Sequence, residues 1–390
     1  MTHEILILLS GLVLFSYLFD VFSRRTRIPA VLLLMGLGFL LQEITHYFNV
    51  TVPGIERVLP TLGTIGLIMI VFEGALDLHF SKEKSGMVFR SFFSALFNLL
   101  GSAAAIALLF HYYSGADFNS CMLNAIPYAV VSSAIAIPSV STLDSSTKEF
   151  IVYESTFSDI LGIMLFNFFL VNREVQTESF IAFGADIIIT LLISAGFSIL
   201  MLFIMGRISH HVKFFLIISM LVLIYSMGKM FHLSSLIIVL ALGLLFRNAH
   251  QMPIKRFREK MLYDHYQQDF IQLHQLSAES AFLIRTFFFI IFGFLIKPET
   301  LTGFDTIEYG VVFIIFILII RVVYYLLTTR KIPLPETLIN PRGLISILLF
   351  YSIPNSQLLG MANEGLLFIV ILGTSLVMTL GLLMTNSIRK

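Results

Sequence analysis

The amino-acid sequence predicts an all-α polytopic membrane protein with about thirteen transmembrane helices, arranged as two inverted-topology repeats whose two broken helices cross at the membrane midplane. Composition is the first observation behind this prediction: 57% of the 390 residues are hydrophobic and only 13% are charged, which soluble proteins of this size do not show. The second observation is that apolar segments of bilayer length recur along the whole chain. The third is that two of these segments carry a natural helix break and lie an odd number of spans apart, so they cross the membrane in opposite directions.

The apolar segments follow one another with mostly short polar connections. We expect spans near residues 4–23, 28–43, 59–77, 88–112, 122–142, 150–171, 180–206, 213–228, 232–247, 279–296, 308–328, 338–354 and 364–386. The run 213–247 is too long for one span, and Gly228-Lys229 divides it. With this division most Lys and Arg of the loops fall on one side, which the positive-inside rule assigns to the cytoplasm. The sequence therefore predicts a multi-pass protein of the cell membrane with its N-terminus outside and its C-terminus cytoplasmic.

The chain leaves no room for a second, soluble domain. We expect residues 1–390 to form a single transmembrane domain, with repeat one near 1–171, repeat two near 213–390 and an inner linker near 249–278. The linker is expected to lie on the membrane surface as an amphipathic helix, with a plain tether as the alternative. The net charge of +1 gives no basic field for nucleic acid. The single cysteine, Cys121, excludes an internal disulfide, and no motif for a cofactor or ATP is present.

Two carboxylates lie inside the apolar segment 150–171. At roughly 100° per residue, Glu154, Ser155, Ser158 and Asp159 share one face of a helix. An ionisable group at the depth of Asp159 costs at least about 2.5 kcal/mol unless it binds a cation or takes up a proton. A buried acid that is simply protonated or salt-bridged is the alternative. We interpret Asp159 as the ligand of an alkali cation and a proton in turn, with Ser155, Glu154 and Ser158 beside it.

The two interrupted segments supply further oxygen atoms. In the first, Ser132 and Ser133 precede Pro138, and a helix broken there would expose carbonyls and hydroxyls that can replace the water shell of a cation. In the second, Asn340-Pro341-Arg342-Gly343 marks the break. Two ordinary proline kinks are the alternative.

Three further charges lie within predicted spans and are assigned structural roles. Arg285 is expected to pair with Glu154, since a buried charge needs a partner. Arg342 is expected to compensate the negative ends of the broken helices. Glu73 is interpreted as a structural or gating acid.

At these residues the chain resembles the monovalent cation/proton antiporter superfamily, and most closely its NhaP/NHE-like sodium/proton antiporters. The resemblance covers nearly the whole chain, and Ser158 and the run Ser132-Ser133-Ala134 stand where that branch usually has Asn and Thr-Asp-Pro. The matching motifs are Arg27-Ile28-Pro29, Phe72-Glu73-Gly74, Glu154-Ser155-x-x-Ser158-Asp159, Arg285-Thr-Phe-Phe-Phe and Arg342-Gly343-Leu344.

The resemblance implies a homodimeric secondary transporter, not an enzyme, that exchanges Na⁺ or Li⁺ for H⁺ by alternating access and serves pH homeostasis. Exchange is expected to be electroneutral, because Ser158 cannot hold a charge and Arg285 cannot shed a proton at working pH. A K⁺/H⁺ antiporter of the same superfamily is one alternative. A sodium-coupled organic-anion symporter and an intramembrane hydrolase are alternatives from other classes, although no span interior holds a histidine suited to the hydrolase.

Overall fold

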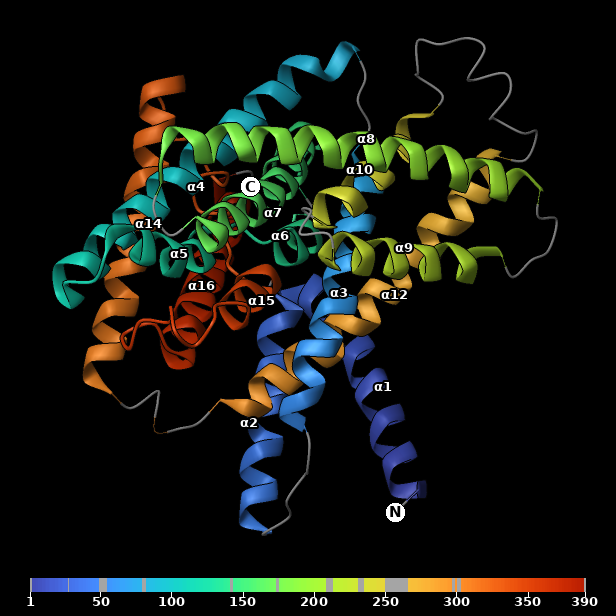
Figure 1. Ribbon diagram of the computed structural model, residues 1–390. Coiled ribbons are helices and arrows are strands. Elements are labelled where there is room, and N and C mark those ends of the chain that lie inside the picture. The colour runs from blue at the N-terminus through green and yellow to red at the C-terminus, as the bar shows by residue number, and fades with distance from the viewer. Residues whose placement is uncertain are drawn as a thin grey trace. The chain divides into compact units, whose positions relative to one another are not determined.

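The computed structural model describes residues 2–26, 28–48, 55–78, 82–140, 143–172, 175–207, 213–230, 235–249, 266–296, 299 and 303–388. Within these residues all regular structure is helical, which confirms the predicted all-α class (Figure 1). The helices are α1 (Thr2–Thr26), α2 (Ala30–Tyr47), α3 (Ile55–Asp77), α4 (Ser85–Ser114), α5 (Phe118–Ala129), α6 (Ser133–Ser139), α7 (Ser145–Val171), α8 (Thr177–Arg207), α9 (Lys213–Met230), α10 (Ser235–Asn248), α12 (Tyr266–Leu295), α14 (Phe304–Thr329), α15 (Leu344–Tyr351) and α16 (Glu364–Ile388), with a short 3-10 turn at Lys82–Lys84.

The helices agree with the expected spans. Among the described residues, eight helical segments are long and apolar enough to cross a membrane. The long run after residue 213 forms two helices as expected, although α9 continues through Gly228-Lys229 to Met230 before α10 begins at Ser235. Part of the predicted inner linker, 250–265, lies outside the described residues, and 266–278 are the first part of α12. The inverted relation of the two repeats stays a prediction.

The chain divides into two compact units, which are described separately. The first unit comprises Met1–Gly63, Phe89–Gly162 and Leu283–Lys390, and the second comprises Thr64–Val88 and Ile163–Phe282. Four helices, α3, α4, α7 and α12, contribute residues to both units.

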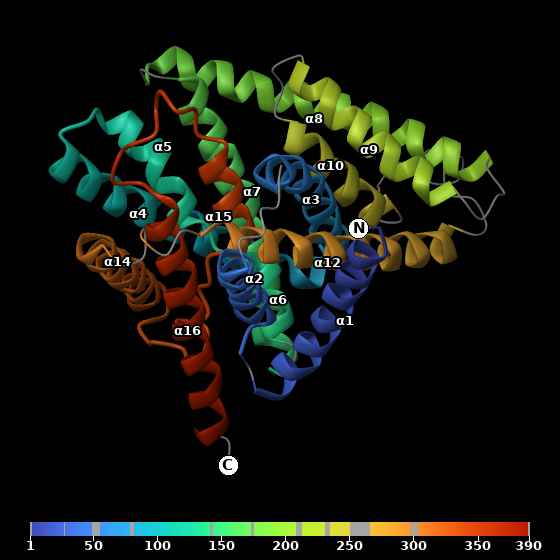
Figure 2. The ribbon, with the colours of Figure 1, turned by 90° about the horizontal axis from the view of Figure 1, so that it is seen from below.

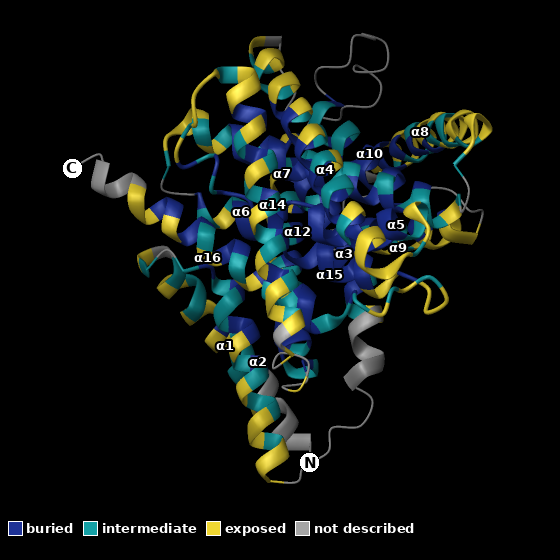
Figure 3. Cartoon of the chain, turned by 90° about the vertical axis from the view of Figure 1, so that its left-hand side faces the viewer, coloured by how far each residue is buried: buried dark blue, intermediate teal, exposed yellow. Residues whose placement is uncertain are grey.

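The first unit is built around short buried helices. α15 packs on α5, and α14 packs along α16, as Figures 1 and 2 show. Residues Leu344–Phe350 of α15 are all buried, and the dark blue of α15 in Figure 3 marks this. Glycine permits a close approach of α2 and α12, because a Cβ on Gly38 would lie 2.1 Å from the carbonyl oxygen of Ile290. A short helix of about eight residues cannot span a bilayer, so α15 depends on the helices that surround it.

In the second unit α10 packs against both α8 and α9. α8 exposes large apolar side chains on one face, including Ile181 and Leu192, as a helix in contact with lipid requires (Figure 3). In the same unit, His274 Nε2 on α12 lies 2.9 Å from Asp77 Oδ1 on α3. Glu73, one turn before Asp77, is half-buried on α3 in this unit.

Candidate ion-binding site

An extended segment interrupts the first broken helix. α5 ends at Ala129, Val130 has φ −72° and ψ 127°, Ser132 has φ −86° and ψ 116°, and α6 begins at Ser133. The break was expected around Ser132 to Ser139; it lies at the start of that range, at residues 130–132, and Pro138 lies inside α6. The helix is interrupted before Pro138 because the backbone N–H groups of residues 131–133 donate to acceptors on other segments and not to carbonyls of α5.

α7 supplies two of those groups. The Val131 N–H donates to Ser158 Oγ at 2.9 Å, and the Ser133 N–H donates to Asp159 Oδ2 at 3.2 Å. Gly162, one turn further along α7, allows the close contact, since a Cβ there would lie 2.3 Å from Val130 Cγ2. The polar face expected of this helix therefore binds the extended segment through Ser158 and Asp159.

The second break meets the first. The Ser132 N–H donates to the carbonyl of Pro341 at 2.8 Å. A Cβ on Gly343 would lie 2.6 Å from Ser132 Oγ and 2.7 Å from Ile135 Cδ1, so only glycine allows this approach. α15 starts directly after Gly343. The two interrupted segments are therefore in direct contact through their backbones.

Oxygen atoms without partners lie at this contact. Asp159 is 5% exposed, and its Oδ1 has no hydrogen-bond partner among the described residues; the same holds for the Oγ of Ser132, which is fully buried. Ser155 Oγ donates to the Ile151 carbonyl at 2.8 Å, which leaves its lone pairs open. Carboxylate and hydroxyl oxygens are hard ligands, and in proteins they replace the water molecules around hard cations. The residues present fit an alkali cation in contact with Asp159.

Arg342 compensates the carboxyl end of α5. Its side chain is fully buried, and it donates from Nε to the Tyr128 carbonyl at 2.8 Å and from Nη2 to the Ala129 carbonyl at 3.0 Å. Nη1 donates to both the carbonyl and Oδ1 of Asn340. The last carbonyls of a helix lack partners within it and carry partial negative charge. The guanidinium therefore stands at the first break, the position for which it was expected.

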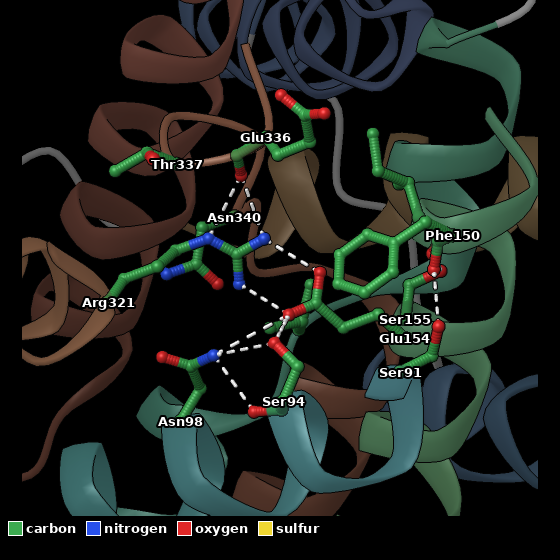
Figure 4. A network of polar contacts seen from close by, with 12 residues as sticks. Ser91, Ser94, Asn98, Phe150, Glu154, Ser155, Arg321, Glu336, Thr337 and Asn340 are labelled. Carbon is green, nitrogen blue, oxygen red and sulfur yellow. Dashed lines mark hydrogen bonds and ion pairs between the residues drawn. The ribbon is translucent and has the colours of Figure 1, made fainter. Parts of the chain in front are cut away.

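Glu154 has a different partner from the one expected. Arg321 on α14 holds its carboxylate with two bonds, Nη1 to Oε1 at 2.9 Å and Nη2 to Oε2 at 2.7 Å (Figure 4). Ser94 Oγ on α4 donates to Oε1 at 2.5 Å, and Asn98 Nδ2 lies 3.5 Å from the same atom. The predicted pair of Glu154 with Arg285 is therefore wrong.

Glu154 and Arg321 start at similar depths along their helices in the structure. Glu154 lies nine residues after the start of α7 at Ser145, and Arg321 lies eight residues before the end of α14 at Thr329. At about 1.5 Å per residue both side chains start some 12 to 14 Å from those ends. The polar stripe of α4 was also overlooked, although its spacing places it on one face; its members are Ser91, Ser94, Asn98 and Ser102.

Arg285 makes its contact elsewhere. Its Nη1 donates to the carbonyl of Ala134 in α6 at 3.0 Å. Glu73 belongs to the second unit. Asp159, Ser158, Ser155, Ser132, Ser133, Glu154 and Arg342, by contrast, all belong to the first unit.

A helix interrupted between α5 and α6, in backbone contact with the non-helical stretch before α15 and beside a buried carboxylate, is typical of secondary transporters that bind ions within the membrane. The family described as "Sodium/hydrogen exchanger, transmembrane" matches residues 10–385. The chain belongs to this sodium/hydrogen exchanger family and is a multi-pass membrane protein.

Solved structures share the fold. The sodium proton antiporter MjNhaP1 from Methanocaldococcus jannaschii, at pH 8, superposes with a TM-score of 0.71 at 19% identity, covering 99% of this chain and 100% of that one. An electron-microscopy structure of the same antiporter gives a TM-score of 0.66 at 18% identity, covering 99% and 96% of the two chains. Among curated proteins, none matches the chain significantly. At this identity the structures establish the fold, and the family match establishes the class of transporter.

Proposed function

We propose that the protein exchanges Na⁺ for H⁺ by alternating access, with Asp159 binding each in turn. The observation that carries this proposal is a buried carboxylate whose Oδ1 has no partner among the described residues and whose Oδ2 accepts the N–H of Ser133, one residue after the contact between the two breaks. A single carboxylate must lose its proton to bind a cation, so competition for one site is enough to couple the two movements. Ser155, Ser133 and Ser158 complete or support the oxygen shell.

Exchange is proposed to be electroneutral. Glu154 is 1% exposed and bound by Arg321, Ser94 and Asn98, and it is proposed to keep these partners throughout the cycle. Arg321 and Arg342 are guanidinium groups, which keep their charge at working pH. These contacts leave Asp159 as the titrating group of the cycle, and one proton then balances one monovalent cation.

The proposal extends to orientation and role. The protein is placed in the cell membrane with its N-terminus outside and its C-terminus cytoplasmic, because that arrangement puts most loop Lys and Arg inside. The resemblance to its family favours a homodimer. It also favours a role in pH homeostasis. Cross-linking in native membranes tests the dimer, and cysteine labelling of the loops tests the orientation.

Purified protein in liposomes that contain a trapped pH dye tests the exchange. Addition of Na⁺ to the outside should alkalinise the lumen, because each Na⁺ that enters is exchanged for a proton that leaves. Liposomes loaded with Na⁺ and diluted into Na⁺-free buffer should acidify. Li⁺ and K⁺ salts are added in turn to the same liposomes. A response to K⁺ with none to Na⁺ would establish the K⁺/H⁺ alternative, and sodium uptake that moves no proton would contradict exchange.

Membrane voltage should leave the Na⁺/H⁺ balance point unchanged. A potential acts on transported charge at about 2.3 kcal/mol per elementary charge per 100 mV, and one-for-one exchange carries no net charge. A potassium potential set with valinomycin provides the voltage, and the balance point is the Na⁺ gradient at which the dye signal stops changing. A balance point that moves with voltage would show a second transported proton and would point first to Glu154.

A further inference from the structure

A proline inside α6 leaves one carbonyl of this short helix without its usual donor. In an α-helix the N–H of each residue donates to the carbonyl four residues earlier, so the carbonyl of Ala134 should receive the N–H of residue 138. Residue 138 is a proline, which has no N–H, and its ring also crowds the carbonyl at that position. The Ala134 carbonyl is buried, so it needs another donor.

Arg285 provides that donor from another helix. Its Nη1 lies 3.0 Å from the Ala134 carbonyl oxygen, and among the described residues the guanidinium forms no ion pair. A hydrogen bond from a charged group is roughly twice as strong as one between neutral groups. A residue other than proline at 138 would complete the bond within α6. With proline there, the geometry of α6 depends on α12.

The position of Ala134 gives this contact a consequence for the ion site. Ala134 directly follows Ser133, whose N–H donates to Asp159 Oδ2 at 3.2 Å. We infer that Arg285 is a positioning residue: it supplies the donor that Pro138 withholds, holds the first turn of α6 in place, and so keeps the Ser133 N–H on the carboxylate of Asp159. This role differs from the pairing with Glu154 that the sequence predicted. The test of this role by transport measurements rests on the proposed function.

Four proteins test the inference in liposomes: the native chain, Arg285→Met, Pro138→Ala and the double variant. Methionine removes the donors with little change in volume, and Pro138 is exposed, so alanine there leaves no cavity while it restores an N–H. Arg285→Met should raise the apparent KM for Na⁺ about tenfold or more, with a smaller effect on the maximal rate. The apparent KM of Pro138→Ala should stay within about twofold of the native value. The apparent KM of the double variant should stay within about threefold of that of Pro138→Ala, because the restored N–H replaces Arg285.

Three further outcomes complete the test. Arg285→Lys retains a charged donor, so its apparent KM for Na⁺ should lie between those of the native chain and Arg285→Met. A double variant as impaired as Arg285→Met would overturn the inference, since Pro138 would then be unrelated to the role of Arg285. If Arg285→Met does not fold, folded protein should return when Pro138→Ala is added, and failure to return would equally contradict it.

A readout that needs no transport separates this inference from the proposed function. The melting temperatures of the same four proteins in detergent should show a loss for Arg285→Met that largely disappears in the Pro138→Ala background. If the native chain moves no Na⁺, the proposed function fails, but the melting temperatures of the four proteins still test the contact between Arg285 and the Ala134 carbonyl. Equal losses in both backgrounds would show that Arg285 and Pro138 are not coupled.

Discussion

Replacement of Asp159 by Asn should reduce cation-driven proton flux to the level of protein-free liposomes. Asparagine keeps the size of the side chain and can still accept a hydrogen bond from the Ser133 N–H, but it can bind neither a proton nor a cation through a negative charge. The melting temperature should therefore stay near that of the native chain, so the loss reports chemistry and not unfolding. The dye assay with Na⁺ pulses measures the flux.

The matched control removes an acid from another membrane helix. Asp186 lies on α8 in the second unit with its side chain exposed, and Asp186→Asn should exchange Na⁺ for H⁺ at close to the native rate. Persistent Na⁺-driven proton flux in Asp159→Asn would show that another group carries the ions.

Removal of either member of the Glu154–Arg321 pair should cause the largest loss of stability. Both side chains are nearly inaccessible to solvent, and loss of one partner leaves a buried charge unpaired, which costs roughly 3 to 5 kcal/mol. Glu154→Gln and Arg321→Gln should each lower the melting temperature markedly in detergent. The double variant should lose less than the sum, because it leaves no unpaired charge.

Arg285 provides the contrast within the same experiment. It donates to the Ala134 carbonyl and does not contact Glu154, so the losses of Arg285→Met and Glu154→Gln should add. Glu308→Gln, on the exposed surface of α14, should change the melting temperature little. Additive losses for Glu154 and Arg321, or strong coupling between Glu154 and Arg285, would contradict the assigned pairing.

Hydropathy and helical periodicity predicted most of the fold. Each expected span contains a helix, because the apolar length required by a bilayer is a property of the local sequence. The face shared by Ser158 and Asp159 was also predictable, since helical spacing fixes which side chains point the same way. Both side chains hold the extended segment at the first break.

The partner of Glu154 and the place of the break could not be predicted in this way. Arg285 and Arg321 are both arginines inside predicted spans, and periodicity alone does not say which helices pack together. Pro138 is a strong local signal for a break, yet it lies near the end of α6, where Arg285 satisfies the carbonyl that it leaves open. Tertiary contacts therefore outweighed the local signal.

Counting the protons released when Na⁺ binds tests the central claim most directly. Calorimetric titration of Na⁺ into purified protein, in buffers that differ in ionisation enthalpy, gives the number of protons displaced per cation. If Asp159 holds either ion in turn, about one proton should leave per Na⁺ at acidic pH, the number should fall toward zero as the pH rises, and Asp159→Asn should release none. Na⁺ binding that displaces no proton at any pH, or the same displacement in Asp159→Asn, would contradict the account.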